Sequence, residues 1–108
     1  METLKKDSEK LIEAKLGKEI KNMGGWSIKL LSTFIKGLPD RMCLLPTGII
    51  FFMEVKSTGK KPTIAQKIIH KKLRSLGFNV YVIDSLSMLE GLMEIYKHRL
   101  IEISGIKK

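Results

Sequence analysis

Apolar residues recur along much of the chain at a spacing of three to four, which is the period of an amphipathic helix. Three segments carry this pattern, at residues 8–23, 63–76 and 85–98. N-cap candidates stand at or near their starts, two of them in a capping-box pattern: Ser8, Thr63 with Gln66, and Ser87 with Glu90. Glycine follows the first two segments, as is typical of helix ends.

The helix expected at 63–76 has one apolar and one basic side. Its buried face is expected to comprise Ile64 or Ala65, Ile68 or Ile69, Leu73 and Leu76. The basic side carries Lys67, Lys71, Lys72 and Arg74. A helix of this kind is expected to pack its apolar side on a sheet.

Short apolar runs bounded by turn residues predict strands. They lie at residues 26–31, 42–45, 49–53 and 79–84. Residues 49–53 are apolar at every position, so this strand is expected to be central and covered on both faces. The tail is expected to add an edge strand at 99–103 and then to fray. The order α-β-β-β-α-β-α predicts an α/β fold with a mixed sheet (α+β), in one domain over residues 1–108.

The stretch from Gly37 to Lys56 predicts one β-hairpin that gathers charged side chains. A three-residue loop, Pro46-Thr47-Gly48, makes Leu45 and Ile49 the closing pair of the hairpin. Counting antiparallel partners outward places Asp40 opposite Glu54, on the same face and about 5 Å apart at Cβ. Lys56 follows Glu54 by two and shares that face. The hairpin therefore presents two carboxylates and one ammonium together.

Two carboxylates this close repel each other unless a cation lies between them. A divalent metal is one solution, because Mg²⁺ binds one or two protein carboxylates together with waters and substrate phosphates. The alternative is a structural salt bridge of Lys56 with Glu54 or Asp40. The hairpin geometry leaves both interpretations open.

The charge balance adds a candidate partner. The 108 residues carry a net charge of +9, from 20 Lys and Arg against 11 Asp and Glu. Such an excess favours a polyanionic partner, and nucleic acid is the first candidate. A carboxylate cluster on a basic domain indicates metal-assisted phosphate chemistry. No apolar run approaches the roughly 18 residues of a membrane span, so we expect no membrane partner.

The N-terminal residues, the single cysteine and the two histidines predict an intracellular, cytoplasmic protein without a zinc site. The N-terminal ten residues are charged and have no signal-peptide core. The single cysteine, Cys43, lies inside a predicted strand and is expected to be a core residue rather than a nucleophile. His70 and His98 have no metal-ligand spacing with each other or with Cys43.

The motif PD, then about a dozen residues, then E-x-K resembles the PD-(D/E)XK nuclease superfamily, which has a restriction-endonuclease-like fold. A longer string is similar to the VRR-NUC (virus-type replication-repair nuclease) family. It reads Gly37-Leu-Pro-Asp-Arg, Leu45-Pro-Thr-Gly, Phe52-Met-Glu-Val-Lys and Gly59-Lys-Lys-Pro-x-x-x-Gln66. The similarity also includes a helix-1 glutamate and a strand lysine after Gly-Gly, and it runs from about Ser8 to Ser85.

The resemblance implies a role for each site residue. Asp40 and Glu54 would bind Mg²⁺ or Mn²⁺ with the backbone carbonyl of Val55, and Lys56 would orient or activate the attacking water. Gln66 would lie near the metal or the scissile phosphate, although its capping box alone would explain it. The helix-1 glutamate matches Glu13, with Glu9 as the alternative. The candidates for DNA contact are Lys29, Arg41, Lys60 and Lys61, and a solvated loop is the alternative for the last two.

The resemblance also implies a reaction and an assembly. The expected enzyme is a metal-dependent endodeoxyribonuclease that leaves a 5′-phosphate. Stand-alone, phage-type members resemble dimeric Holliday junction resolvases, so a homodimer acting on branched DNA in the host cytoplasm is expected. Two symmetric cuts in a four-way junction need two sites related by a two-fold axis. The alternatives are a nicking or flap nuclease without junction preference, and a non-catalytic basic DNA-binding module.

Overall fold

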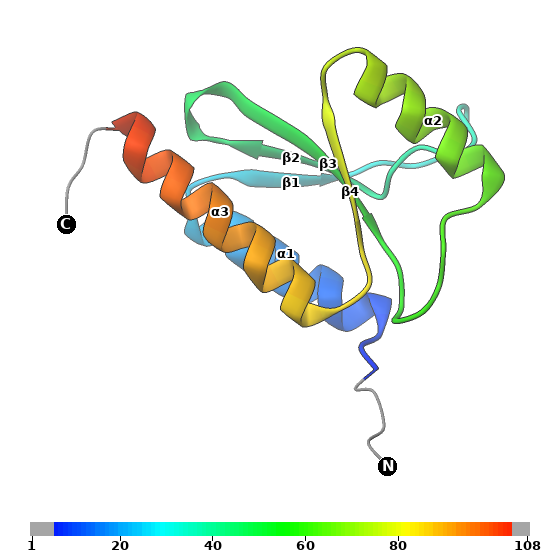
Figure 1. Ribbon diagram of the computed structural model, residues 1–108, viewed down its shortest axis with the longest axis horizontal. Coiled ribbons are helices and arrows are strands. Elements are labelled where there is room, and N and C mark those ends of the chain that lie inside the picture. The colour runs from blue at the N-terminus through cyan, green and yellow to red at the C-terminus, as the bar shows by residue number, and fades with distance from the viewer. Residues whose placement is uncertain (1–5, 105–108) are drawn as a thin grey trace.

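The computed structural model describes residues 6–104, which form three helices around one four-stranded sheet (Figure 1). The elements are α1 (Glu9–Asn22), β1 (Trp26–Lys29), β2 (Arg41–Leu45), β3 (Ile49–Val55), α2 (Ile64–Ser75), β4 (Asn79–Ile83) and α3 (Leu86–Ser104). This confirms the predicted order α-β-β-β-α-β-α. None of the described helices has the length and apolar content of a transmembrane span.

The sheet is mixed, with the strand order β1-β2-β3-β4. The first three strands pair antiparallel, and β4 pairs parallel with β3. The parallel pair needs a crossover, which α2 supplies (Figure 1). The fold class expected from the pattern is therefore confirmed.

The β2–β3 hairpin has the predicted register. Leu45 pairs with Ile49 and Arg41 pairs with Met53, so the next position outward sets Asp40 against Glu54. A 3₁₀ turn over Pro46–Gly48 joins the strands. Its left-handed residues are Thr47 (φ 69°) and Gly48 (φ 81°), so the turn uses one non-glycine residue in a region that favours glycine.

The core lies between the sheet and the pair α1 and α3, which cover one face together (Figure 1). Phe51 of β3 stacks on Tyr96 of α3 with ring centroids 4.4 Å apart. Tyr81 and Tyr96 share a hydrogen bond between their hydroxyls at 2.8 Å. Cys43 lies in this core, and burial raises the pKa of its thiol to about 12, so the predicted core role is confirmed.

The other face of the sheet is covered less completely than the sequence predicted. α2 packs along β4, and the prediction that β3 is covered on both faces is wrong at Ile50, which is 40% exposed. The buried side of α2 is centred on His70. The apolar positions of the helix divide between half-buried Ala65, Ile69 and Leu73 and exposed Ile64, Ile68 and Leu76. α2 lies over β4, and a single helix is too narrow to cover β1, β2 and β3 as well.

The C-terminal segment also differs from the prediction. Residues 99–103 form no edge strand, because α3 continues to Ser104. Leu100 keeps the helical spacing of Met93 and Tyr96 and packs against the core, which overrides the strand preference of the nearby isoleucines. The predicted fraying of the last residues concerns 105–108, which lie outside the described part of the chain.

The start of α3 is held by Asp7 rather than by the predicted capping box. The Leu86 backbone N–H donates to Asp7 Oδ2 at 2.8 Å, and the Met88 N–H donates to Ser85 Oγ. Asp7 also pairs with Thr58 through backbone and side chain, and the Thr58 hydroxyl donates to the Asp84 carbonyl at 2.7 Å. A residue before α1 thus ties the loop after β3 to the start of α3.

Candidate active site

The end of the β2–β3 hairpin brings Asp40, Glu54 and Lys56 together, as the register predicted. Asp40 lies one residue before β2, and its Oδ2 accepts a hydrogen bond from the Val55 N–H at 2.7 Å. This bond fastens the first carboxylate to the strand that carries the second. The Lys56 ammonium lies 3.5 Å from Glu54 Oε2.

A close backbone contact fixes the loop that leads into Asp40. Gly37 has φ +92°, and a Cβ built there would lie 2.3 Å from the Ala65 carbonyl oxygen. The loop therefore runs directly against the first turn of α2, and only glycine fits. Buried Pro39 follows and leads to Asp40. The glycine of the GLPD motif thus serves the placement of the carboxylate.

Glu54 is the buried centre of the site, at 1% exposed. Its Oε2 accepts a hydrogen bond from Gln66 Nε2 at 3.0 Å. The other end of the same amide, Gln66 Oε1, accepts from the Thr63 N–H at 2.8 Å and completes the capping box of α2. Gln66 therefore caps α2 and contacts Glu54 at the same time, and its predicted place near a metal or phosphate stays a prediction.

The surroundings of Glu54 oppose its negative charge. Burial first, and then repulsion by Asp40, raise the pKa of Glu54 to about 7, although Lys56 acts in the opposite direction. Glu54 Oε1 is buried without a hydrogen-bond partner among the described residues. A cation next to Asp40 and Glu54 would relieve both conditions, so this donor set fits a divalent metal.

His70 lies against Glu54, although no role was predicted for it from the sequence. It is 2% exposed, and its Nε2 lies 3.5 Å from Glu54 Oε1. Burial, followed by the charges of Arg74 and Lys56, lowers the pKa of the imidazole and favours its neutral form. The sequence feature that could have identified His70 is its position four residues after Gln66, which places both side chains on one face of α2.

The helix-1 glutamate lies apart from the two carboxylates. Glu13 Oε1 pairs with Arg41 Nε at 3.1 Å, so two residues that the resemblance singled out bind each other. Glu9 is exposed in the first turn of α1. Over residues 6–104, no group of three or more His, Cys, Asp or Glu side chains is arranged to hold a metal ion. Protein carboxylates at the site come from the hairpin.

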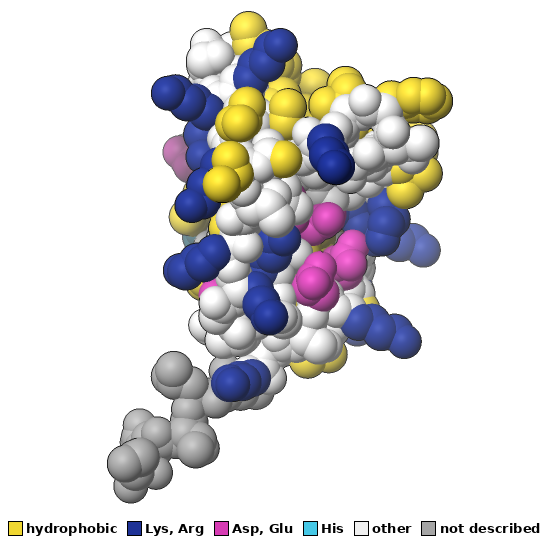
Figure 2. All heavy atoms as spheres, turned by 90° about the vertical axis from the view of Figure 1, so that its right-hand side faces the viewer, with side chains coloured by type: hydrophobic (Ala, Val, Ile, Leu, Met, Phe, Trp, Pro, Cys, Tyr) yellow, Lys and Arg dark blue, Asp and Glu magenta, His cyan; other side chains and the backbone are white. Residues whose placement is uncertain are grey.

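Positive charge surrounds the acidic site. Figure 2 shows acidic side chains near the middle of one face, with Lys and Arg on both sides of them. Lys60 and Lys61 are exposed in the loop after Lys56, and Lys29 is exposed opposite Arg41 on β1. The four predicted DNA contacts therefore comprise three exposed lysines and one arginine that is paired with Glu13.

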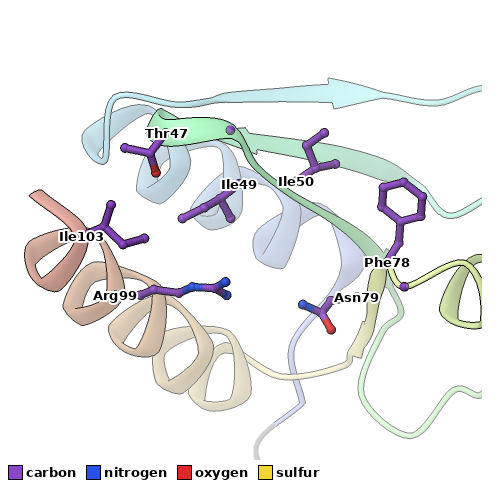
Figure 3. A pocket seen from close by; sticks show the side chains of 9 residues that line it. Thr47, Ile49, Ile50, Phe78, Asn79, Arg99 and Ile103 are labelled. Atoms are coloured by element: carbon purple, nitrogen blue, oxygen red, sulfur yellow. The ribbon is translucent and has the colours of Figure 1, made fainter.

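A separate pocket of about 420 Å³ lies at the other end of the hairpin (Figure 3). It is formed by the β2–β3 turn, the start of β4 and the last turns of α3, and Arg99 extends into it. None of the predicted site residues lines it. Its position away from Asp40 and Glu54 separates it from the candidate chemistry.

Comparison with known proteins agrees with this geometry. No family model matches the chain. The chain is 41% identical over 85 residues to "Putative nuclease p44" of Acyrthosiphon pisum secondary endosymbiont phage 1. The aligned region covers 79% of the chain and 88% of that protein. A solved structure described as a VRR_NUC domain superposes with a TM-score of 0.76 at 30% identity, over 83% of this chain and 99% of the other.

Identity and coverage at this level exceed what a shared fold alone requires. The mixed sheet, the three helices and the superposition establish the PD-(D/E)XK-like fold. The protein accordingly belongs to the VRR-NUC family of nucleases, as a phage-type member.

Proposed function

We propose that residues 1–108 form one metal-dependent endodeoxyribonuclease domain that cuts branched DNA, with the four-way (Holliday) junction as the leading substrate. The observation that carries the proposal is the cluster of Asp40, Glu54 and Lys56 at the hairpin end, in which Glu54 is buried beside a second carboxylate. A purely structural ion pair would need one carboxylate for the lysine, and this site has two.

Mg²⁺ or Mn²⁺ is the proposed cofactor. Asp40, Glu54 and the Val55 carbonyl would hold it. Glu13, or alternatively Glu9, would add a further carboxylate only after leaving its present position, which for Glu13 is the ion pair with Arg41. The bound ion would supply a Lewis acid for phosphodiester hydrolysis. The orphaned oxygen of Glu54 supports this assignment.

The other site residues have separate roles around the scissile phosphate. Lys56 orients or activates the attacking water and balances negative charge as the new bond to phosphorus forms. Gln66 holds Glu54 in place through its 3.0 Å hydrogen bond. Lys29, Arg41, Lys60 and Lys61 bind the DNA backbone, to which the net charge of +9 attracts the whole protein.

The proposed assembly is a homodimer in the cytoplasm of the infected cell. Residues 6–104 of one chain hold one such site, and the symmetric cuts that resolve a junction need two sites. The phage origin of the curated relative supports this setting. A nicking or flap nuclease without junction preference, and a non-catalytic DNA-binding module, are the competing functions.

The test offers a labelled four-way junction, a flap and a linear duplex to wild type, Lys56→Ala and Lys18→Ala, each with Mg²⁺, Mn²⁺ or EDTA. Lys18 is an exposed lysine of α1 and serves as the matched control. We expect symmetric cuts in the junction alone, lost in EDTA and reduced at least about 100-fold in Lys56→Ala. Equal cutting of flaps and junctions would favour the flap nuclease, and binding without any cutting would favour the DNA-binding module.

A further inference from the structure

Large apolar side chains stand exposed on one flank of α2 and on the loop before β2. Phe34, the most exposed of them, is 97% accessible. We call this surface the α2 patch, and its exposed members are Leu31, Phe34, Ile35, Ile64, Ile68 and Leu76. Figure 2 shows hydrophobic side chains gathered over the upper part of one face, above acidic side chains near its middle. The loop leads into Asp40 and α2 carries Gln66, which contacts Glu54, so the patch adjoins the candidate active site.

The patch contains a hollow with an apolar lining. A cavity of about 170 Å³ opens between the loop and the helix, lined by Ile35, Leu38, Ile69, Lys72, Leu73 and Leu76. The two walls approach each other closely where the backbone of Gly37 passes Ala65. A cavity of about 150 Å³ takes a benzene ring, so this one has room for one phenyl ring.

The same loop carries a phenyl ring, that of Phe34, which is not packed against its own chain. Phe34 is the neighbour of Ile35, which lines the cavity, yet its exposure shows that its ring lies outside. A surface with both a projecting aromatic ring and an empty apolar hollow is self-complementary, as a two-fold interface requires. A second copy of this chain therefore matches both features at once.

The size of the patch fits the same occupant. Its exposed apolar side chains amount to on the order of 700 Å², which is above the roughly 300–600 Å² of the largest apolar patch on an ordinary monomer. A standard interface covers about 800 Å² on each partner. The patch thus supplies most of the surface that a stable dimer needs.

We propose that the α2 patch is a homodimer interface in which Phe34 of each copy enters the apolar cavity of the other. The proposal deepens the proposed function, since it gives a surface to the two-site assembly on which junction cutting rests. It also places the interface next to each site. The loop of the patch continues into Asp40, and α2 carries Gln66, so dimer formation would hold both in place.

The test measures the oligomeric state of the full chain by sedimentation velocity without DNA. Wild type is expected at twice the chain mass of 12.3 kDa at micromolar concentration. Phe34→Ser removes the projecting ring, and Leu76→Lys places a charge at the rim of the cavity. Each is expected to raise the dimer dissociation constant at least about 100-fold. Both positions are exposed, so both variants should keep the wild-type circular dichroism spectrum.

The matched control is Ile95→Ser, which changes an exposed isoleucine on α3, in the opposite layer (Figure 1). It should remain dimeric. A monomeric wild type, or an unchanged dissociation constant in Phe34→Ser, would overturn the proposal. If wild type is a monomer and Phe34→Ser weakens junction binding, the ring contacts DNA instead. Metal-dependent cleavage of a single-cut flap substrate reads the nuclease site separately, so either proposal can fail without the other.

Discussion

At the scale of single residues, Glu54 has surroundings that disfavour its ionised form. It is buried, it faces Asp40, and one of its oxygens has no hydrogen-bond partner within residues 6–104. Protonation or a bound cation removes the conflict. The stability of the metal-free protein should therefore depend on pH through this residue.

Glu54→Gln is expected to stabilise the metal-free protein at pH 8. The pKa of Glu54 rises from 4.5 to about 7 on folding, so the stability linked to its proton is complete below about pH 4.5 and is lost as pH rises through 7. At pH 8 the variant should gain on the order of 3 kcal/mol, which corresponds to about 13 °C in melting temperature. At pH 5 the difference should shrink.

The measurement is thermal unfolding in EDTA at pH 5 and pH 8, with Glu102→Gln on the exposed surface of α3 as control. Equal melting temperatures for wild type and Glu54→Gln at both pH values would contradict the prediction. The variant should also lose metal-dependent cleavage, because an amide is a weaker ligand than a carboxylate.

The positions of some residues of the candidate site could be predicted from the sequence, and those of others could not. Asp40, Glu54 and Lys56 lie on one hairpin, so a turn type and a strand period were enough to bring them together. Gln66 came from a family resemblance. The contact of His70 with Glu54 depends on how α2 sits on the sheet, and no local pattern encodes that position.

At the scale of elements, the first turn of α2 and the loop before β2 act as one unit. Gly37 lies against Ala65 with no room for a side chain, and the loop then delivers Asp40 to β3. A change at Gly37 should therefore affect both the stability of the fold and the site. Helix ends were harder to predict than helix cores, since α3 runs through isoleucines that favour a strand.

Gly37→Ala is expected to lower the unfolding free energy of the protein more than Gly77→Ala does. The two glycines have nearly the same backbone angle, φ +92° and +94°, but a Cβ at Gly77 meets nothing within 4 Å. Gly77→Ala should cost about 1–2 kcal/mol of unfolding free energy from backbone strain alone. Gly37→Ala adds a clash with the Ala65 carbonyl.

Urea unfolding compares the two variants, and a cleavage assay follows the site. Gly37→Ala should lose cleavage even under conditions where it stays folded, because the clash displaces Asp40. Equal unfolding midpoints for the two variants would show that the loop yields without strain and that the close contact is not required.

At the scale of the whole molecule, the two faces of the sheet are covered unequally. α1 and α3 seal one face over the aromatic core, whereas α2 covers part of the other and leaves the α2 patch exposed. The N-terminal segment joins these layers through Asp7, which binds Thr58 and Leu86. No local sequence pattern predicts this link, because the partners of Asp7 lie 51 and 79 positions away from it.

Asp7→Ala is expected to lower the unfolding free energy by about 1–2 kcal/mol, because the Leu86 N–H at the start of α3 loses its acceptor. Ser87→Ala is the matched control. Ser87 belongs to the capping box that the sequence predicted, yet it is exposed and Ser85 accepts the Met88 N–H instead. Urea unfolding should give Ser87→Ala a midpoint close to wild type. A larger loss in Ser87→Ala than in Asp7→Ala would reverse the assignment of the cap.

The pairing of Lys56 with β4 has a consequence during protein synthesis. The Lys56 N–H donates to the Ile83 carbonyl at 2.9 Å, and the loop that follows is fastened to Asp84. A ribosome makes residue 56 well before residue 83, so a growing chain can form the hairpin with its two acidic groups while the lysine still has no anchor. Completion of the candidate active site is thus delayed until most of the polypeptide has emerged. If the proposed function holds, a truncated translation product ending before β4 would leave the DNA of the producing cell uncut.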